Sequence, residues 1–291
     1  MTSGADGRSD LALPCDLGPA VAAGRWSCVH RGRLAGRSVA VKVARPHSPD
    51  SASVLRREAR VLSSACHPGL VPIVGFREDA EAPALVLPWA EAGTLVDLAR
   101  LSAGSKSLVC PLGVVAGALD ALHDAGELHL DVTPANILIG PSGPWLSDPA
   151  PPGAGTAGWV DPHVLAGGPA SARSDVFALA VTTVLVLTGL MPAPGDAVEA
   201  PVGAAGNRAL RAALSPEPGV RPGTPTELVD ALEWVPGPGL AEADGRLPTC
   251  RPPPRTWPLR GPPGHESIRD ATGSTHDLAR VFGWRRTRRG G

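Results

Sequence analysis

The sequence has no tyrosine, only three phenylalanines and two methionines, so tryptophan, with seven copies, is its main aromatic residue. Cysteine is also sparse. Its five cysteines are scattered along the chain without a C-x-x-C pair, at Cys15, Cys28, Cys66, Cys110 and Cys250. Their odd number and wide spacing argue against a disulfide framework and against a cysteine-based zinc site. The pattern is typical of a protein in a reducing cytoplasm.

The chain also lacks an excess of charge and a long hydrophobic run. Its 27 Lys and Arg residues against 28 Asp and Glu give a net charge of −1, which predicts no binding to nucleic acid or an anionic membrane. No basic-then-apolar signal peptide opens the sequence. The longest apolar run, residues 176–190, is shorter than the about 20 residues of a membrane span. We therefore expect a cytoplasmic protein in which this run is a buried helix.

Glycine and proline are abundant, with 35 and 33 copies, and much of this excess belongs to loops and a C-terminal tail. Four regions are predicted: a flexible N-terminus (1–10), a small β-rich lobe with one helix (11–92), a larger helical lobe (93–234) and a disordered Pro/Gly/Arg-rich tail (235–291). Hydrophobic patterning predicts strands at 38–43, 70–74 and 85–87, and helices at 53–65, 109–125, 174–190, 209–214 and 226–232.

The segment with the clearest chemistry is residues 129–136, which read HLDVTPAN. A carboxylate and a carboxamide lie five positions apart on a loop that leads into the apolar strand-like residues 137–139. Asp131 could accept the proton of an attacking hydroxyl, and Asn136 could bind a Mg²⁺ ion that carries ATP phosphates. This spacing therefore predicts a phosphoryl-transfer site.

The segment resembles the catalytic loop of eukaryotic-type serine/threonine protein kinases, H-R-D-L-x-x-x-N. The resemblance extends over roughly residues 15–232 and implies an α+β, bilobal protein-kinase-like fold with ATP and Mg²⁺ as cofactors. It also implies transfer of the γ-phosphoryl group to Ser/Thr hydroxyls of a protein substrate. Two residues depart from the pattern. Leu130 replaces an Arg that grips a phosphate on the activation loop, and Thr133 replaces a Lys that balances charge on the γ-phosphate.

Three further residues match motifs of the same family, in the family's order. Lys42, in the strand sequence VAVK, corresponds to the phosphate-binding lysine, and Glu58 on the following helix to the acid that pairs with it. Asp148, in the sequence DPA, takes the place of the metal-binding Asp of D-F-G. The resemblance thus implies catalytic roles for Lys42, Glu58, Asp131 and Thr133, and metal ligation by Asn136 and Asp148.

The resemblance also implies a nucleotide site with a degraded Gly-rich loop, in which Gly24 is the one remaining glycine of three. The implied nucleotide contacts are Ala22, Gly24, Ser27, Val29, Ala40, Lys42, Pro88, Ala90 and Leu138. Val29, Ala40 and Leu138 would sandwich the adenine. Pro88 has no N–H, so the hinge would use its carbonyl together with the N–H of Ala90.

On the substrate side, residues 155–163 resemble the G-T-x-G-Y-x-x-P-E segment that ends the activation loop, with Thr156 near Asp131. The usual Glu is missing, so Arg221 could pair with Asp161 instead. Asp175, at the start of the apolar helix, would anchor the backbone of the catalytic loop. Residues 149–155 contain no side chain that can be phosphorylated, which agrees with the loss of the Arg at Leu130.

Three functions remain open from the sequence. The first is a divergent active kinase, because the minimal set for Mg-ATP chemistry is complete. The second is a pseudokinase that binds nucleotide or a regulatory protein partner without chemistry, because the Gly-rich loop, Thr133, DPA and DPH all depart from the family. The third is a small-molecule phosphotransferase, against which the G-T-x-G-W-x-x-P segment and Asp175 argue. The oligomeric state is open.

Overall fold

The computed structural model describes residues 16–46, 48, 50–78, 82–101, 106–233 and 235. The predicted N-terminus (1–10), and the predicted tail apart from Val235, lie outside the described residues. The described chain forms two compact units, which are treated separately below. The first contains residues 16–55 and 74–89, and the second contains residues 56–73 and 90–235.

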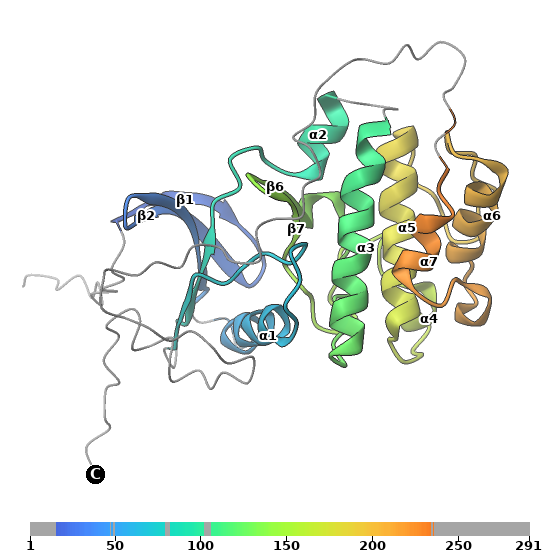
Figure 1. Ribbon diagram of the computed structural model, residues 1–291. Helices are drawn as coiled ribbons and strands as arrows, with labels where there is room; N and C mark the ends of the chain where they lie inside the picture. Colours follow the sequence, from blue (N-terminus) through green and yellow to red (C-terminus); the bar gives the residue numbers. More distant parts are fainter. Residues whose placement is uncertain are drawn as a thin grey trace, which may run out of the picture. The chain divides into compact units, whose positions relative to one another are not determined.

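The first unit is an antiparallel sheet of five strands in the order β1-β2-β3-β5-β4 (Figure 1). Its strands are β1 (Asp16–Ala23), β2 (Ser27–Leu34), β3 (Arg37–Ala44), β4 (Gly75–Arg77) and β5 (Ala84–Pro88). Ala35 and Gly36 both have positive φ, which suits the two-residue turn between β2 and β3. One sheet face carries a cluster formed by Val39, Val41, Ala84 and Val86.

The division between the units falls within α1 (Ser51–Ser64). Within the described residues, the second unit has nine further helices or turns of 3-10 helix and a hairpin. In chain order they are α2 (Leu95–Leu101), η1 (Lys106–Leu108), α3 (Val109–Asp124), η2 (Pro134–Asn136), β6 (Ile137–Gly140), β7 (Gly143–Leu146), α4 (Pro162–Leu165), α5 (Ala172–Thr188), α6 (Ala204–Ala213), η3 (Pro218–Val220) and α7 (Pro225–Asp230).

Helix α5 is the centre of the second unit, where it contacts α2, α3, α6 and α7 (Figure 1). Its side chains are buried almost continuously from Ser174 to Val184, as its apolar sequence predicts. Ser171 and Ser174 form a reciprocal capping box at its start, and Gly189 ends it in the left-handed conformation. The helix therefore has fixed ends, and residues that project from its first turns are held in place.

Most predicted elements are confirmed, with two differences. The strand predicted at 70–74 is wrong: Leu70 makes an isolated bridge to Leu146, and the strand in this region is β4, which begins at Gly75. Pro72 cannot donate a ladder hydrogen bond, which accounts for the interruption. The helix predicted at 209–214 begins earlier in the structure, at Ala204. The sequence did not reveal its first turn, because that turn is made of small residues without apolar periodicity.

Two further expectations bear on the chain's chemistry. Cys28 and Cys66 carry free thiols, but Cys110 is disulfide-bonded, which the scattered cysteine spacing did not predict. Among the helices of the described residues, none is long and apolar enough to cross a membrane.

Candidate active site

The loop that precedes β6 holds a carboxylate and a carboxamide in contact. The Nδ2 of Asn136 donates to Asp131 Oδ2 at 2.7 Å and to the Asp131 carbonyl at 2.8 Å. These two bonds orient the amide, so the Oδ1 atom of Asn136 is turned away from Asp131 and can serve as an oxygen ligand. The predicted base and the predicted metal-binding amide are therefore brought together.

Thr133 has a local structural role in this loop. It is 4% exposed, and its Oγ1 accepts the N–H of Asn136 at 3.3 Å as the N-cap of η2. The hydroxyl thus helps to set the turn that carries Asn136. Its predicted part in catalysis stays a prediction, and a threonine at this position supplies no positive charge.

The buried carboxylate of Asp175 on α5 anchors the loop through hydrogen bonds to its backbone. Its Oδ2 accepts the N–H of His129 at 3.0 Å and lies 2.8 Å from Nε2 of His123, while its Oδ1 accepts the N–H of Leu130 at 2.7 Å. Asp175 is fully buried, and a buried carboxylate requires such donors. The predicted anchoring of the loop by Asp175 is confirmed.

His129 is a neutral spacer inside the site. Its Nε2 lies 3.0 Å from the carbonyl oxygen of Ser147, and its Nδ1 accepts the N–H of Asp131 at 3.3 Å, so the proton is on Nε2. Burial lowers the pKa of His129, although the carboxylates of Asp175 and Asp131 oppose the shift. The ring therefore links the catalytic loop to the DPA segment without adding charge.

Two residues of the site have left-handed backbones without being glycine. Leu130 has φ 66° and Asp148 has φ 63°. Such a conformation costs on the order of 1–3 kcal/mol and persists when the surroundings determine it. The bond from Leu130 N–H to Asp175 supplies that constraint on one side. On the other side, the N–H of Ala150 donates to the His129 carbonyl at 2.9 Å.

Ser147 connects the two predicted metal ligands. Its N–H donates to the Asn136 carbonyl at 2.9 Å, and its Oγ lies 3.1 Å from that carbonyl and 2.8 Å from Asp148 Oδ2. A carboxylate and an amide oxygen are the hard donors that Mg²⁺ prefers. The residues present thus fit a magnesium ion, which Asn136 and Asp148 would hold.

In the first unit, several predicted nucleotide contacts share one face of the sheet. Ala22 pairs with Val29, and Val29 pairs with Lys42, so their side chains point to the same side. Ala40, two residues before Lys42 on β3, faces that side too, opposite the Val39 and Val41 cluster. Lys42 is 5% exposed.

The remaining predicted nucleotide contacts lie outside this group. Gly24 and Ser27 close the turn between β1 and β2, with a bond from Gly24 N–H to the Ser27 carbonyl at 2.9 Å. Pro88 ends β5, where the missing N–H is tolerated. Ala90 and Leu138 belong to the second unit.

Glu58 lies on the second-unit part of α1 and is 6% exposed, so its charge is withdrawn from solvent. Its neighbours fasten the helix to the segment before the catalytic loop. Arg57 Nη2 donates to the Leu128 carbonyl at 3.0 Å, and Arg60 forms an ion pair with Glu127. Burial lowers the pKa of Arg57, and the Glu127 carboxylate opposes this. These contacts hold the helix that carries Glu58.

The substrate-side segment docks on the catalytic loop through its backbone. The N–H of Thr156 donates to Asp131 Oδ1 at 2.8 Å. Gly155 comes so close to Leu130 that an added Cβ would lie 2.5 Å from the Leu130 carbonyl oxygen. Leu130, Trp159 and Val160 are among the residues that line a small pocket beside this contact. The position that holds an Arg in the family pattern is here part of an apolar surface.

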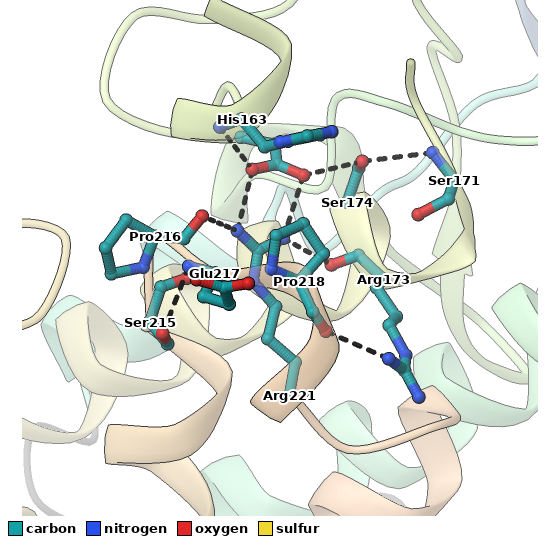
Figure 2. A network of polar contacts seen from close by, with 10 residues as sticks. His163, Ser171, Arg173, Ser174, Ser215, Pro216, Glu217, Pro218 and Arg221 are labelled. Atoms are coloured by element: carbon teal, nitrogen blue, oxygen red, sulfur yellow. Dashed lines mark hydrogen bonds and ion pairs between the residues drawn. The ribbon is translucent and has the colours of Figure 1, made fainter. Parts of the chain in front are cut away.

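Asp161 and Arg221 form the buried ion pair that closes the segment. Arg221 Nη2 lies 2.7 Å from Asp161 Oδ1, and Nη1 lies 2.8 Å from Oδ2, in a bidentate arrangement. Figure 2 shows the Arg221 side chain among the backbone carbonyls that it also bonds, those of Arg173, Ser215 and Pro216. The predicted pairing is confirmed.

The remaining donors to Asp161 complete its shell. Ser174 Oγ donates to Oδ2 at 2.7 Å, and the N–H of His163 donates to Oδ1 at 2.9 Å. Burial raises the pKa of Asp161, but the bonds from Arg221, Ser174 and the His163 N–H outweigh it and hold the pKa below its ordinary value. Asp161 lies two positions before the place of the family's Glu and replaces it as the partner of the arginine. Both oxygens of its carboxylate accept hydrogen bonds.

Sequence reasoning missed three residues that shape the site: Ser147, His123 and Thr182. Each acts through a hydrogen bond to a residue distant in sequence, and none belongs to a motif. His123 had a weak signal, since it lies in the last turn of α3, shortly before the loop. Ser147 and Thr182 had none.

The chain matches the protein kinase domain family over residues 18–210. It is 32% identical over 184 residues to a DNA damage-responsive serine/threonine-protein kinase, RqkA, of Deinococcus radiodurans, covering 56% of this chain and 28% of that protein. It is 34% identical over 198 residues to the serine/threonine-protein kinase PknL of Mycobacterium tuberculosis, covering 60% of this chain and 49% of that protein. The chain thus matches half or less of the length of these relatives.

Among solved structures, the kinase domain of Mycobacterium tuberculosis PknI is similar with a TM-score of 0.59. The likeness covers 75% of this chain and 94% of that domain at 24% identity. At this identity the comparison shows the fold alone. It confirms the predicted α+β architecture, with an antiparallel sheet in the N-terminal part and a helical C-terminal region.

The first prediction concerns the buried ion pair. Arg221→Ala leaves the Asp161 carboxylate buried and without its cation, so the free energy of unfolding should fall by about 3–5 kcal/mol. Urea denaturation followed by circular dichroism measures the change. Arg208→Ala, which removes an exposed arginine of α6, is the matched control and should stay within about 0.5 kcal/mol of wild type. Equal effects of the two substitutions would contradict the assigned role.

The second prediction follows from the lowered pKa of Asp161. A carboxyl whose pKa is lower in the folded state stabilises the fold above its unfolded pKa of about 3.9, and this stabilisation is lost as the pH falls through the folded value. The stability gap between wild type and Asp161→Asn should therefore be largest near neutral pH and narrow below about pH 4. Urea midpoints at several pH values measure the gap, and a gap that widens in acid would refute the assignment.

Proposed function

The chain belongs to the protein kinase family, and we propose that it is a serine/threonine protein kinase that transfers the γ-phosphoryl group of Mg-ATP to a hydroxyl of a protein substrate. The observation that carries the proposal is the position of Asp131. One carboxylate oxygen is held by the amide of Asn136, and the other by the N–H of Thr156 in the substrate-side segment. The base, the metal-binding amide and the substrate-side segment are thus joined by hydrogen bonds.

In this proposal each residue of the site has one task. Asp131 takes the proton of the attacking hydroxyl, and its two hydrogen bonds fix its direction. When bound, Mg²⁺ neutralises charge on the phosphates, and Asn136 and Asp148 are the residues that would hold it. Lys42 supplies a positive charge for the phosphates, on a sheet face that also carries Val29 and Ala40. In the family pattern, the acid at the position of Glu58 pairs with the lysine at the position of Lys42.

We further infer that activity does not depend on phosphorylation of the activation loop. Residues 149–155 offer no hydroxyl to modify, and Leu130, which lines a small and mostly apolar pocket, stands where a phosphate-gripping arginine would be expected. Contacts present without any phosphate hold the segment: Thr156 on Asp131, Gly155 against the Leu130 carbonyl, and Asp161 on Arg221. These contacts support an ordered segment in the unmodified chain.

The competing function is a pseudokinase that binds a nucleotide or a protein partner. The observation that favours it is Thr133, whose hydroxyl caps η2 and brings no cation toward a transferring phosphate. Loss of such a charge can lower a rate on the order of 10²-fold or more. The kinase and a nucleotide-binding pseudokinase therefore differ in the rate of transfer, whereas a pseudokinase that binds only a protein partner would not bind Mg-ATP.

The third prediction tests transfer directly. After incubation with Mg-ATP, the intact mass of the wild type should increase by whole phosphate groups, while Asp131→Asn should be slower by about 10²-fold or more, because it lacks the base. Thermal unfolding with and without Mg-ATP is measured in parallel. Asp131→Asn should keep the stabilisation by nucleotide, and Lys42→Met should lose most of it.

The outcomes of this experiment separate the two functions. Stabilisation of the wild type by Mg-ATP with no mass gain would favour the pseudokinase. A mass gain that is equal in wild type and Asp131→Asn would remove Asp131 as the base.

The fourth prediction concerns regulation. The protein is first treated with a broad-specificity phosphatase, which is then removed. It should phosphorylate dephosphorylated casein at a constant rate from the start of the reaction, without a lag, because no phosphate is needed to order the segment. The control is the same protein incubated first with Mg-ATP. A lag that disappears after this incubation, together with a phosphate mapped to residues 149–161, would overturn the inference.

A further inference from the structure

A second connection between the substrate-side segment and the catalytic loop runs through the interior of α5. Thr182 is fully buried on this helix. Its Oγ1 accepts the indole N–H of Trp159 at 2.8 Å and donates its own proton to the carbonyl oxygen of Val132 at 2.6 Å. This hydroxyl is therefore both a donor and an acceptor. It connects the catalytic loop at Val132 with the substrate-side segment at Trp159.

Both partners of this hydroxyl matter because of their positions. Val132 follows Asp131 directly and is fully buried, so its carbonyl requires a donor from within the protein. In the described part of the chain, Thr182 supplies it. Trp159 lies three residues after Thr156, which bonds Asp131, and Trp159 and Leu130 both line the same small pocket. The relay thus holds the backbone on one side of Asp131 and the segment that faces its carboxylate.

We propose that Thr182 is a positioning residue for phosphoryl transfer: its hydroxyl sets the distance between the Asp131 carboxylate and the acceptor side of the site. This inference rests on the proposed kinase function. Thr182 acts through Val132 and Trp159 and has no role in binding the nucleotide. Its loss should therefore weaken use of the protein acceptor and leave use of ATP unchanged.

The chain contains a matched control next to this residue. Thr183 is also fully buried on α5, but its hydroxyl donates to the Leu179 carbonyl of its own helix at 2.8 Å. Thr183→Val and Thr182→Val remove the same atoms from the same helix at neighbouring positions. The first removes a bond within the helix, and the second leaves the Val132 carbonyl and the Trp159 N–H without partners.

The kinetic experiment uses the full chain with dephosphorylated casein as acceptor, and varies casein and ATP in turn. We expect kcat/KM for casein to fall about tenfold in Thr182→Val, with KM for ATP changed by less than about twofold. Thr182→Ser keeps the hydroxyl and should recover most of the loss. Thr183→Val should resemble wild type. A purely structural role would instead predict similar losses for both substrates.

A double-mutant cycle tests whether the relay acts as one unit. Trp159→Phe removes the indole N–H and should lower kcat/KM for casein in the same direction. Because both substitutions break the same connection, the Thr182→Val, Trp159→Phe double variant should lose less than the product of the two single effects. Multiplicative losses would mean that the two residues act separately, and would overturn the proposal.

Hydrogen–deuterium exchange of the same variants distinguishes failure of the relay from failure of the kinase function. Thr182→Val should speed amide exchange in peptides that cover residues 129–133 and 155–160, and Thr183→Val should not. If the wild type transfers no phosphate to casein, the kinase function fails and the exchange pattern alone decides on the relay. Equal exchange in both valine variants would overturn it.

Discussion

The candidate site depends above all on the carboxylate of Asp175, buried in the first turns of α5. It accepts the N–H groups of His129 and Leu130 and lies within hydrogen-bond distance of the His123 ring. Other helices pack against α5 on several sides, so the position of this carboxylate is fixed. Its hydrogen bonds therefore hold in place a loop that has little regular structure of its own. This anchor is one of the contacts that hold the left-handed backbone of Leu130.

The same helix holds the substrate-side segment at two further points. Ser174, one residue before Asp175, donates to Asp161, and Thr182 accepts from Trp159. Asp161 is also fixed by Arg221 from the loop before α7. One face of α5 thus supports the catalytic loop, and neighbouring positions support the segment opposite it. Helix α5 therefore contributes to the positions of both Asp131 and the substrate-side segment, and Arg221 adds a second support for the latter.

The sequence predicted long or strongly patterned elements well. Helices α1, α3 and α5 were found because their apolar residues recur over many turns or form a continuous buried run. The ion pair of Asp161 with Arg221 was also predictable, since the loss of the usual Glu left an arginine in need of an acid. The strand at 70–74 was overpredicted because its apolar residues suit a strand, while Pro72 interrupts the ladder.

Hydroxyl contacts were beyond reach of the sequence. Thr182 and Thr183 are neighbouring threonines in the same apolar run. The hydroxyl of Thr182 bonds segments outside the helix, and that of Thr183 bonds a carbonyl of its own helix. Only the direction in which each side chain projects from α5 separates them. Ser147 is a similar case, because its link between Asn136 and Asp148 depends on how β7 returns beside the catalytic loop.

The two departures from the family's catalytic loop have a common physical consequence. Leu130 stands where the family has an arginine; its backbone N–H bonds Asp175, but its side chain carries no charge. Thr133 stands where the family has a lysine; its hydroxyl caps η2, but it too carries no charge. The loop therefore lacks two cations of the family pattern, while the hydrogen bonds of Leu130 to Asp175 and of Asn136 to Thr133 are present. Positioning acts on the approach of the reacting groups, whereas a cation near the γ-phosphate acts on the charge of the transition state. Under the proposed kinase function, these two changes alone should alter the rate of the transfer step more than the binding of Mg-ATP.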